Sequence, residues 1–167
     1  MEQFSCNIIS MTNKSKMQNS EELSDLIKRV FASQQFAVLA TQSEGQPYGN
    51  LVAFAEADNL RSLLFVTSRD TRKYSNILVS RKVAVLIDSR TNQALDLNNA
   101  VAITALGNIE EASTANKEYL SGIYLTKHPQ LKDFLHKPSN ALMKVSVTDY
   151  IVATFESVRH FPIRQQE

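Results

Sequence analysis

The residues best suited to chemistry in this sequence follow one another in a single polar segment. Apolar residues from Leu63 to Val66 precede it, and the segment itself reads Thr67, Ser68, Arg69, Asp70, Thr71, Arg72 and Lys73. The change from an apolar run to capping residues predicts a buried strand, a short loop and a helix that begins at Asp70 or Thr71. Arg72 and Lys73 therefore fall in the first turn of a helix.

Cations in that first turn indicate an anion site. A helix N-terminus already carries positive partial charge, so Arg72 and Lys73 are unfavourable there unless an anion lies between them. A phosphate group would reverse the sign of this effect, because arginine offers a planar fork of donors and lysine a point charge. The hydroxyl groups of Thr67, Ser68 and Thr71 would add further donors at the same loop.

A second interpretation of the basic segment stays open. Short basic clusters are common on protein surfaces, where Arg69, Arg72 and Lys73 would form a solvated face and Asp70 would supply a salt bridge. Charge spacing alone favours this solvated face over an anion site.

The elements that would position this segment are mostly short strands. Apolar residues at Leu23, Leu26, Ile27, Val30 and Phe31 predict an amphipathic helix before them. Three strands are predicted next, in an antiparallel meander over 36–41, 50–55 and 62–67. The helix of the basic segment runs to Ser80, and another strand is predicted over 83–87.

The second half of the chain predicts a helical insert between strands. A long strand is expected within 98–109, where Gly107 would permit a bulge or a close approach of two backbones. Helical spacing covers 113–136, with Pro129 opening a second short helix. Alternation at Met143, Val145 and Val147, followed by a run over 151–158, predicts a closing hairpin that turns at Asp149 and Tyr150.

These elements define the fold class. Six or seven strands, few helices and no repeated βα unit predict a mainly β fold with flanking helices, a small antiparallel barrel. Residues 1–19 lack periodicity and are expected to form a flexible N-terminal arm, while 20–167 form a single domain.

Composition excludes several classes of function. Lys and Arg total 18 against 17 for Asp and Glu, so we expect neither nucleic acid nor a membrane as partner. The single cysteine, Cys6, has no partner for an internal disulfide, and no signal peptide or long apolar run is present. We therefore expect a cytoplasmic protein. His128, His136 and His160 lack close metal-ligand spacing, so no metal site is expected.

Three short motifs in order resemble one known family. They are Pro47 to Phe54, Leu64 to Ser68, and Thr71 to Ile77. Together they resemble the pyridoxamine 5'-phosphate oxidase-like family of FMN-binding split barrels, over about Leu23 to Phe161. This resemblance implies a split barrel that binds flavin mononucleotide (FMN), and a homodimer with FMN at the subunit interface.

The resemblance also implies the residues that hold the cofactor. The strand over 50–55 would lie along the flavin, largely through its backbone, and the end of the next strand would contact it. Arg72 and Lys73 would bind the phosphate. The full set is Asn50, Leu51, Val52, Ala53, Phe54, Ala55, Val66, Thr67, Ser68, Thr71, Arg72 and Lys73.

Two departures from the family's best-known enzymes bear on the substrate. Those enzymes carry a flavin-contacting glutamine where this sequence has Ala102, and a C-terminal tryptophan, whereas this chain has none. The departures argue against oxidation of vitamin B6. The sequence therefore predicts an FMN-dependent oxidoreductase of unknown substrate. The alternatives are a non-catalytic FMN carrier or sensor, or a haem-binding protein on the same barrel.

For the other candidate residues, a structural or solvated role is favoured over a role in chemistry. His160 could approach a ligand at the barrel mouth, although a terminal Arg159-His160 pair is more often solvated. Asp96, Asn98 and Asn99 precede the long strand, where they are expected to shape a turn. Helical spacing favours core or dimer contacts for Tyr119, Tyr124 and Phe134.

Overall fold

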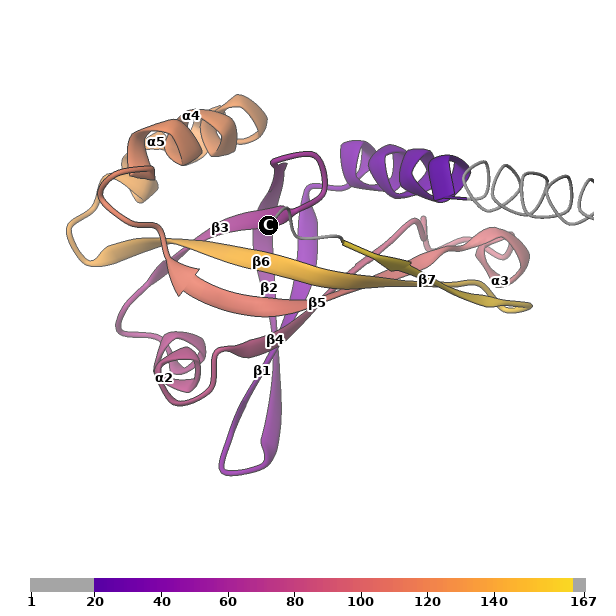
Figure 1. Ribbon diagram of the computed structural model, residues 1–167, viewed down its shortest axis with the longest axis horizontal. Helices are drawn as coiled ribbons and strands as arrows, with labels where there is room; N and C mark the ends of the chain where they lie inside the picture. The colour runs from indigo at the N-terminus through magenta and orange to yellow at the C-terminus, as the bar shows by residue number, and fades with distance from the viewer. Residues whose placement is uncertain (1–19, 164–167) are drawn as a thin grey trace, which may run out of the picture.

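Seven antiparallel strands form one sheet in the computed structural model, which describes residues 20–163. The sheet order is β3-β2-β1-β4-β5-β6-β7, and a further pairing of β3 with β6 closes six strands into a barrel that leaves β7 outside (Figure 1). The predicted small antiparallel barrel is confirmed. The strands are β1 Phe36–Ser43, β2 Gln46–Ala57, β3 Ser62–Ser68, β4 Lys82–Asp88, β5 Ala102–Glu111, β6 Asn140–Ala153 and β7 Val158–Pro162.

Helices cover the barrel at several points. Residues 20–33 form the predicted amphipathic helix, whose Phe31 ring meets Phe54 and Tyr150 edge-on at 5.4 and 5.8 Å between centroids. The insert between β5 and β6 is helical as predicted, and Pro129 opens its second part. The remaining helices are α2 Arg72–Val79, α3 Asp96–Asn99, α4 Lys117–Lys127, η1 Pro129–Leu131 and α5 Lys132–Leu135.

Alternation along the strands separates two apolar cores. Side chains such as Leu39, Phe65 and Val85 point into the barrel, where they pack with the helix over residues 20–33. A second core lies between α4, α5 and the outer faces of β2, β3 and β6. Its members are Ala55, Ala57, Leu64, Val66, Ala112, Leu120, Tyr124, Leu135 and Leu142.

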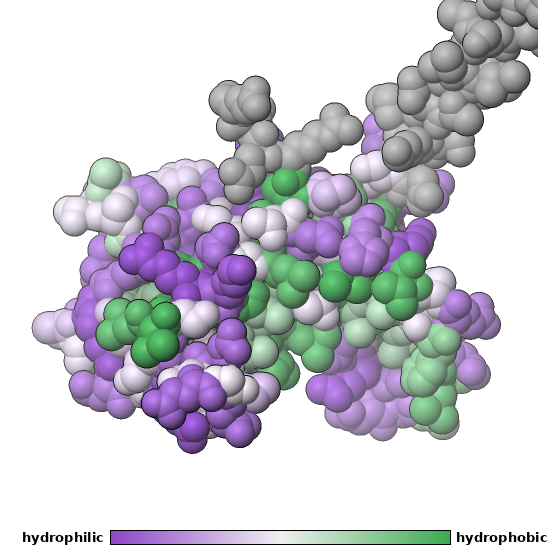
Figure 2. Space-filling view, turned by 60° about the horizontal axis from the view of Figure 1, so that its bottom comes forward, coloured by the Kyte–Doolittle hydropathy of each residue, from purple (hydrophilic) through white to green (hydrophobic). Residues whose placement is uncertain are grey.

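The outer face of the other strands is also apolar. Val38, Leu86, Thr104 and Ile151 are cross-strand neighbours on β1, β4, β5 and β6, and each is half-buried. We call these four residues the outer row. Figure 2 shows hydrophobic side chains in a band across the centre and right of one face of the molecule, with hydrophilic groups around them.

Gly107 is required by a bulge in the long strands. The β5–β6 register shifts between Leu106 and Gly107, and a Cβ on Gly107 would lie 2.3 Å from the Ser146 carbonyl oxygen. The extra residue resets the alternation of β6, so Val147 and Tyr150 both face the barrel interior. The expected bulge or close approach at Gly107 is confirmed.

The bulge also explains where the predicted closing hairpin was misplaced. Asp149 and Tyr150 lie within the single strand β6, and the chain turns instead at residues 154–157 before β7. There the Thr154 hydroxyl accepts hydrogen bonds from the backbone N–H groups of Glu156 and Ser157. The sequence alternation breaks at Asp149 because a residue is inserted, not because the strand ends.

Asp96, Asn98 and Asn99 also differ from their predicted turn, since they form the short helix α3, and the long strand begins only at Ala102. The Asp96 carboxylate accepts hydrogen bonds from the backbone N–H groups of Gln93 and Thr91, and these bonds lower its pKa. That carboxylate therefore organises the loop before the helix.

The predicted arm at 1–19, with Cys6, lies outside the described residues. Within residues 20–163 no helix is long and apolar enough to cross a membrane.

Candidate functional site

Strands β2 and β3 diverge, and the opening between them faces the start of α2. They pair only from Phe54 with Phe65 to Ala57 with Ser62. Before Phe54, β2 is paired with β1 alone, and after Phe65, β3 is paired with β6 alone. The facing backbone edges of 50–53 and 66–68 therefore lack a strand partner. We call this opening the fork.

Tyr124 of α4 occupies the closed end of the fork. In the register of β2 and β3, the pair after Phe54 and Phe65 would be Ala53 and Val66. The Tyr124 hydroxyl lies between these two residues in place of a direct backbone hydrogen bond. It donates to the Ala53 carbonyl oxygen at 3.4 Å and accepts from the backbone N–H of Val66. Burial raises the pKa of Tyr124 to about 12, so the hydroxyl keeps the proton that it donates.

The helix start predicted from the sequence is confirmed at Thr71, the N-cap of α2. Its side chain accepts a hydrogen bond from the backbone N–H of Tyr74, and its hydroxyl donates to the Ser68 carbonyl oxygen at 2.8 Å. The Thr67 hydroxyl lies 3.2 Å from the Thr71 hydroxyl. Hydroxyl groups thus fix the loop that joins β3 to α2.

Arg72 and Lys73 lie in the first turn of α2 without a counter-charge. No acidic residue occupies that turn, and neither side chain has an ion-pair partner among residues 20–163. The Arg72 guanidinium lies 4.7 Å from the centroid of the Tyr48 ring. Lys73 is half-buried, and burial lowers its pKa because no carboxylate compensates the desolvation. Both cations are free to take an anion.

Arg69 has a different role from its two neighbours. Its guanidinium pairs with Glu111 rather than with Asp70, and it also donates to the carbonyl oxygens of Pro138 and Asn140 at 2.9 Å. The Tyr74 hydroxyl donates to Glu111 as well, at 3.2 Å. The predicted solvated face with an Asp70 salt bridge is therefore wrong for Arg69, which ties the loop to β5 and β6.

Asn50 supplies an unsatisfied donor on β2. Its side-chain nitrogen is buried and has no hydrogen-bond partner among the residues that the structure describes. Asn50 lies two residues from Tyr48, on the same face of β2. A buried amide without a partner costs about 1–3 kcal/mol, and a ligand acceptor would remove this cost.

The other predicted site residues lie along the fork, but several of their side chains are committed elsewhere. Val52 and Phe54 point into the barrel, and Ala55 and Val66 lie beneath α4. The Phe54 carbonyl oxygen already bonds His128 Nε2 at 2.8 Å. These residues can offer only backbone groups, and Leu51 is 66% exposed on the opposite face.

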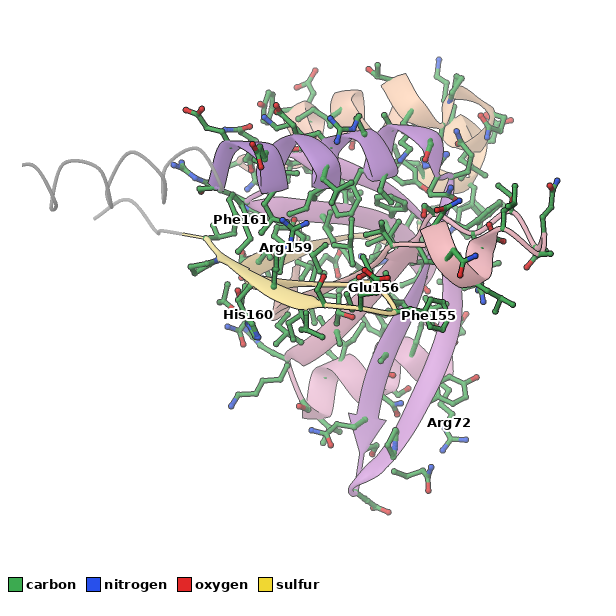
Figure 3. The ribbon with its side chains drawn as sticks, turned by 90° about the vertical axis from the view of Figure 1, so that its right-hand side faces the viewer. Arg72, Phe155, Glu156, Arg159, His160 and Phe161 are labelled. Carbon is green, nitrogen blue, oxygen red and sulfur yellow. The ribbon has the colours of Figure 1, made fainter. Side chains whose placement is uncertain are left out.

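His160 does not share this site within one chain. Figure 3 shows His160 on β7 well apart from Arg72. Its Nδ1 lies 2.9 Å from Asp149 Oδ2, while Asp149 Oδ1 is buried without a hydrogen-bond partner among the described residues. Within 20–163 no group of three or more His, Cys, Asp or Glu side chains could hold a metal ion.

Two residues at this site were missed by sequence reasoning. Tyr48 lies within a motif that carried the family resemblance, yet its position beneath Arg72 depends on the β1–β2 hairpin. Tyr124 has the helical spacing of a core residue, and its ring is indeed buried. Only the hydroxyl at the fork separates it from an ordinary core tyrosine, and no spacing rule reveals that contact.

Comparison with known protein families identifies the class. A family model described as pyridoxamine 5'-phosphate oxidase matches residues 23–152, so it spans the barrel, the fork and the start of α2. The chain belongs to this family. A search of curated proteins finds no matching sequence.

Solved structures share the fold at low sequence identity. A heme binding protein from Mycobacterium smegmatis aligns with a TM-score of 0.71 and 14% identity, covering 80% of this chain and 55% of that one. General stress protein 26 from Bacillus anthracis str. Sterne aligns with a TM-score of 0.63 and 19% identity, covering 84% of this chain and 98% of that one. A FAD-binding protein from Mesorhizobium loti aligns with a TM-score of 0.59 and 15% identity, covering 74% of this chain and 87% of that one. These likenesses show the fold, and this chain spans about half of the heme binding protein.

Proposed function

We propose that this protein binds FMN, with the phosphate held by Thr71, Arg72 and Lys73. The observation that carries the proposal is the pair of cations without a counter-charge in the first turn of α2, beside the fork. A phosphate there would interact favourably with both side chains and with the helix N-terminus.

The fork suits the rest of the cofactor. A flavin ring system presents an apolar face and a polar edge with hydrogen-bond donors and acceptors. The backbone edges of 50–52 and 67–68, beyond the pair bonded to Tyr124, and the Asn50 amide offer complementary groups. In the oxidoreductase that we propose, bound FMN would supply the electron or hydride transfer. The chain's own residues bind and orient the group, and none of them is proposed as a proton donor.

A homodimer is part of the proposal. The outer row forms a half-buried strip across four strands, apolar at every position but Thr104, which is the type of surface that a second copy of the chain would cover. FMN would then lie at the subunit interface, in the cytoplasm. Among residues 20–163 the two edges of the fork have no strand between them, and in this proposal a partner subunit completes the site.

A second candidate function is haem binding, and one contact favours it. Nδ1 of His160 is engaged by Asp149, which would fix the ring and leave Nε2 to hold a haem iron. The structural similarity to a heme binding protein agrees with this candidate. A non-catalytic FMN carrier or sensor is the remaining alternative.

Titration of the purified protein with FMN and with haem tests these functions. We expect FMN to bind with quenched flavin fluorescence, and bleaching by a nicotinamide donor would favour the oxidoreductase over a carrier. A Soret shift with haem, lost in His160→Ala, together with no response to FMN would replace the proposal by haem binding.

The double variant Arg72→Ala/Lys73→Ala tests the phosphate site. Loss of two charge-assisted contacts should weaken FMN binding by about 3 kcal/mol, or roughly a hundredfold in Kd. Lys28→Ala/Lys132→Ala removes the same charge from exposed positions outside the fork and should leave Kd within about twofold. Equal losses in both variants would rule out the assigned phosphate contacts.

A further inference from the structure

The β1–β2 hairpin extends beyond the barrel without support from another strand. β4 pairs with β1 only at residues 38–40, and β3 pairs with β2 only from Phe54 onward. Residues 41–48, which we call the hairpin tip, therefore lie outside the closed sheet. Figure 1 shows this end of the hairpin projecting from the barrel. Since the tip carries Tyr48, its position decides where that ring lies relative to Arg72.

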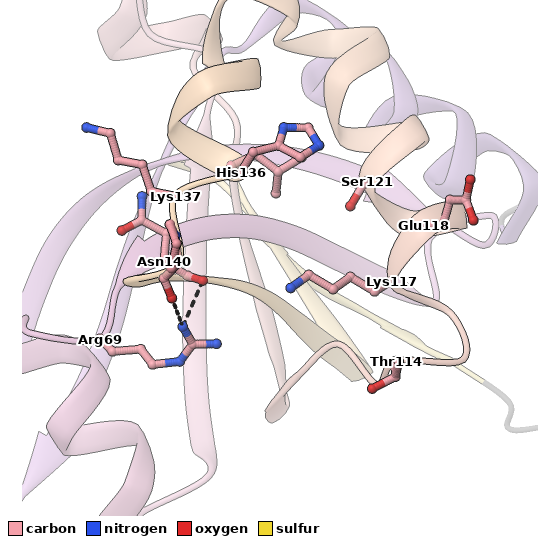
Figure 4. A pocket seen from close by; sticks show the side chains of 10 residues that line it. Arg69, Thr114, Lys117, Glu118, Ser121, His136, Lys137 and Asn140 are labelled. Atoms are coloured by element: carbon pink, nitrogen blue, oxygen red, sulfur yellow. Dashed lines mark hydrogen bonds between the residues drawn. The ribbon is translucent and has the colours of Figure 1, made fainter.

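The other half of the proposed phosphate site is fixed to the barrel. Arg69 precedes α2 and pairs with Glu111 at the end of β5. Its guanidinium also donates to the carbonyl oxygens of Pro138 and Asn140, beside the cavity drawn in Figure 4. The Tyr74 hydroxyl of α2 donates to the same Glu111 carboxylate. The start of α2 is therefore tied to β5, to β6 and to the connection between α5 and β6.

A buried hydrogen bond joins the hairpin tip to α2. The Asn76 side-chain nitrogen donates to the Thr41 hydroxyl at 3.1 Å, and that hydroxyl donates to the Tyr48 carbonyl oxygen at 3.4 Å. Asn76 is 4% exposed and Thr41 is 3% exposed, so loss of either partner leaves the other without water to replace it. Among residues 20–163 this is the one side-chain hydrogen bond between α2 and the tip.

This buried bond lies next to the contact between Arg72 and Tyr48. Thr41 and Tyr48 are directly opposite each other in the β1–β2 register, so their side chains share one face of the hairpin. Arg72 and Asn76 are four residues apart on α2, which places them on one face of the helix. Helix and hairpin therefore meet in two neighbouring contacts, one buried and one exposed. The buried bond fixes the spacing at which the exposed contact forms.

We propose that Asn76 and Thr41 are positioning residues of the phosphate site. Their hydrogen bond holds the hairpin tip against α2 and so keeps the Tyr48 ring against the Arg72 guanidinium. This inference rests on the proposed FMN function, because it concerns the same phosphate contacts. Neither positioning residue touches the cofactor. An arginine whose plane is already fixed loses less side-chain freedom when its donors bind a phosphate, so the buried bond strengthens binding from a distance.

Flavin titration of Thr41→Val tests this role, since valine keeps the branched shape of threonine and removes the hydroxyl. We expect FMN to bind about two- to fivefold more weakly, as in Tyr48→Leu, because both variants release Arg72. Thr41→Ser restores the hydroxyl and should bind FMN like the wild type. Riboflavin lacks the phosphate and should bind every variant with its wild-type Kd. Equal losses for FMN and riboflavin would overturn the proposal, because they indicate a general structural defect.

Two further variants separate positioning from stability. Adding Thr41→Val to Tyr48→Leu should weaken FMN binding by less than about 1.5-fold more, because both substitutions remove one support, whereas additive losses would overturn the path through Tyr48. Thr41→Val/Asn76→Leu removes both partners of the buried bond and leaves no donor unpaired, so it replaces Thr41→Val if that variant does not fold. Thr126→Val, which removes an exposed hydroxyl on α4, is the matched control and should bind both flavins normally.

The side-chain NMR signals of Arg72 report the same contact without any flavin. The ring current of Tyr48 should shift these signals in the wild type and in Thr41→Ser, and the shift should be lost in Thr41→Val and Thr41→Val/Asn76→Leu. A retained shift in the folded variants would overturn the positioning role, whether or not FMN binds. Loss of the shift, together with no FMN binding by the wild type, would support the positioning of Arg72 and reject the proposed function instead.

Discussion

At the scale of single residues, three cations of one short segment have different environments. Arg69 is neutralised by Glu111, Arg72 rests on the Tyr48 ring, and Lys73 is half-buried without a carboxylate. Their types and spacing predicted a shared role. Their roles differ because their contacts differ. Glu111 is 42 residues from Arg69 in the sequence and is brought to it only by the folding of the barrel.

Tyr48 is expected to hold Arg72 in position for an anion. Replacing the ring in Tyr48→Leu removes a cation–π contact worth about 0.5–1 kcal/mol, so FMN should bind about two- to fivefold more weakly. Fluorescence titration measures the change. Tyr48→Phe keeps the ring and should bind like the wild type; equal loss in both variants would assign the effect to the phenol hydroxyl.

Lys127 should make the free energy of unfolding depend on pH. Its ammonium donates to the Phe31 carbonyl oxygen and lies 3.8 Å from the Phe54 ring centroid, and burial lowers its pKa from 10.5 to about 8 despite the nearby Glu56. Between pH 8 and 10.5 the unfolded chain binds more protons at this position. Stability therefore gains a positive slope with pH in that window.

Urea denaturation between pH 7 and pH 10 measures this slope. The free energy of unfolding of wild type minus that of Lys127→Met should rise from pH 8 to pH 10, since the variant has no group to titrate. A flat or falling difference would show that the hydrogen bond to Phe31 keeps Lys127 charged across the window.

At the scale of elements, α4 sets where β2 and β3 separate. Tyr124→Phe would keep the buried ring but leave the Ala53 carbonyl and the Val66 N–H without their partner. We expect a loss of about 1–2 kcal/mol in the free energy of unfolding, measured by urea denaturation. Tyr119→Phe, on the same helix and exposed, should change it by less than about 0.5 kcal/mol.

The β5–β6 bulge predicts opposite outcomes for two glycines. Gly107→Ala would drive a Cβ into the Ser146 carbonyl, so the protein should lose about 2 kcal/mol or more. Gly122→Ala on α4 meets no atom within 4 Å and should gain about 0.5–1 kcal/mol from helix propensity. Thermal unfolding of both variants compares them, and equal stabilities would contradict the close approach at Gly107.

Sequence reasoning succeeded for these elements where the signal was local. The apolar stripe from Leu23, the cap at Thr71 and the glycine at the bulge each depend on near neighbours. It failed at Asp149, where an inserted residue imitates a turn, and at Tyr124, whose partner Ala53 is 71 residues away. Contacts set by tertiary packing have no local pattern to reveal them.

At the scale of the whole molecule, the outer row should hold two copies of the chain together. Leu86→Lys places a charge in the middle of that row and should convert a dimer into monomers, because a charge buried in an apolar interface is not compensated. Sedimentation equilibrium measures the mass independently of shape. Gln130→Lys, exposed on η1, is the matched control and should stay dimeric; dissociation of both would count against this face.

The fork has a consequence for exchange with solvent. Backbone amides along the open edges of 50–53 and 66–68 have no neighbouring strand to bond, whereas amides deep in β5 and β6 are paired on both sides. Except at Val66, whose N–H bonds the Tyr124 hydroxyl, the amides that face the fork should therefore take up deuterium early, while the rest of the barrel remains protected. A cofactor bound there would accept hydrogen bonds from these amides in place of a strand. Its binding would therefore slow deuterium uptake along both edges.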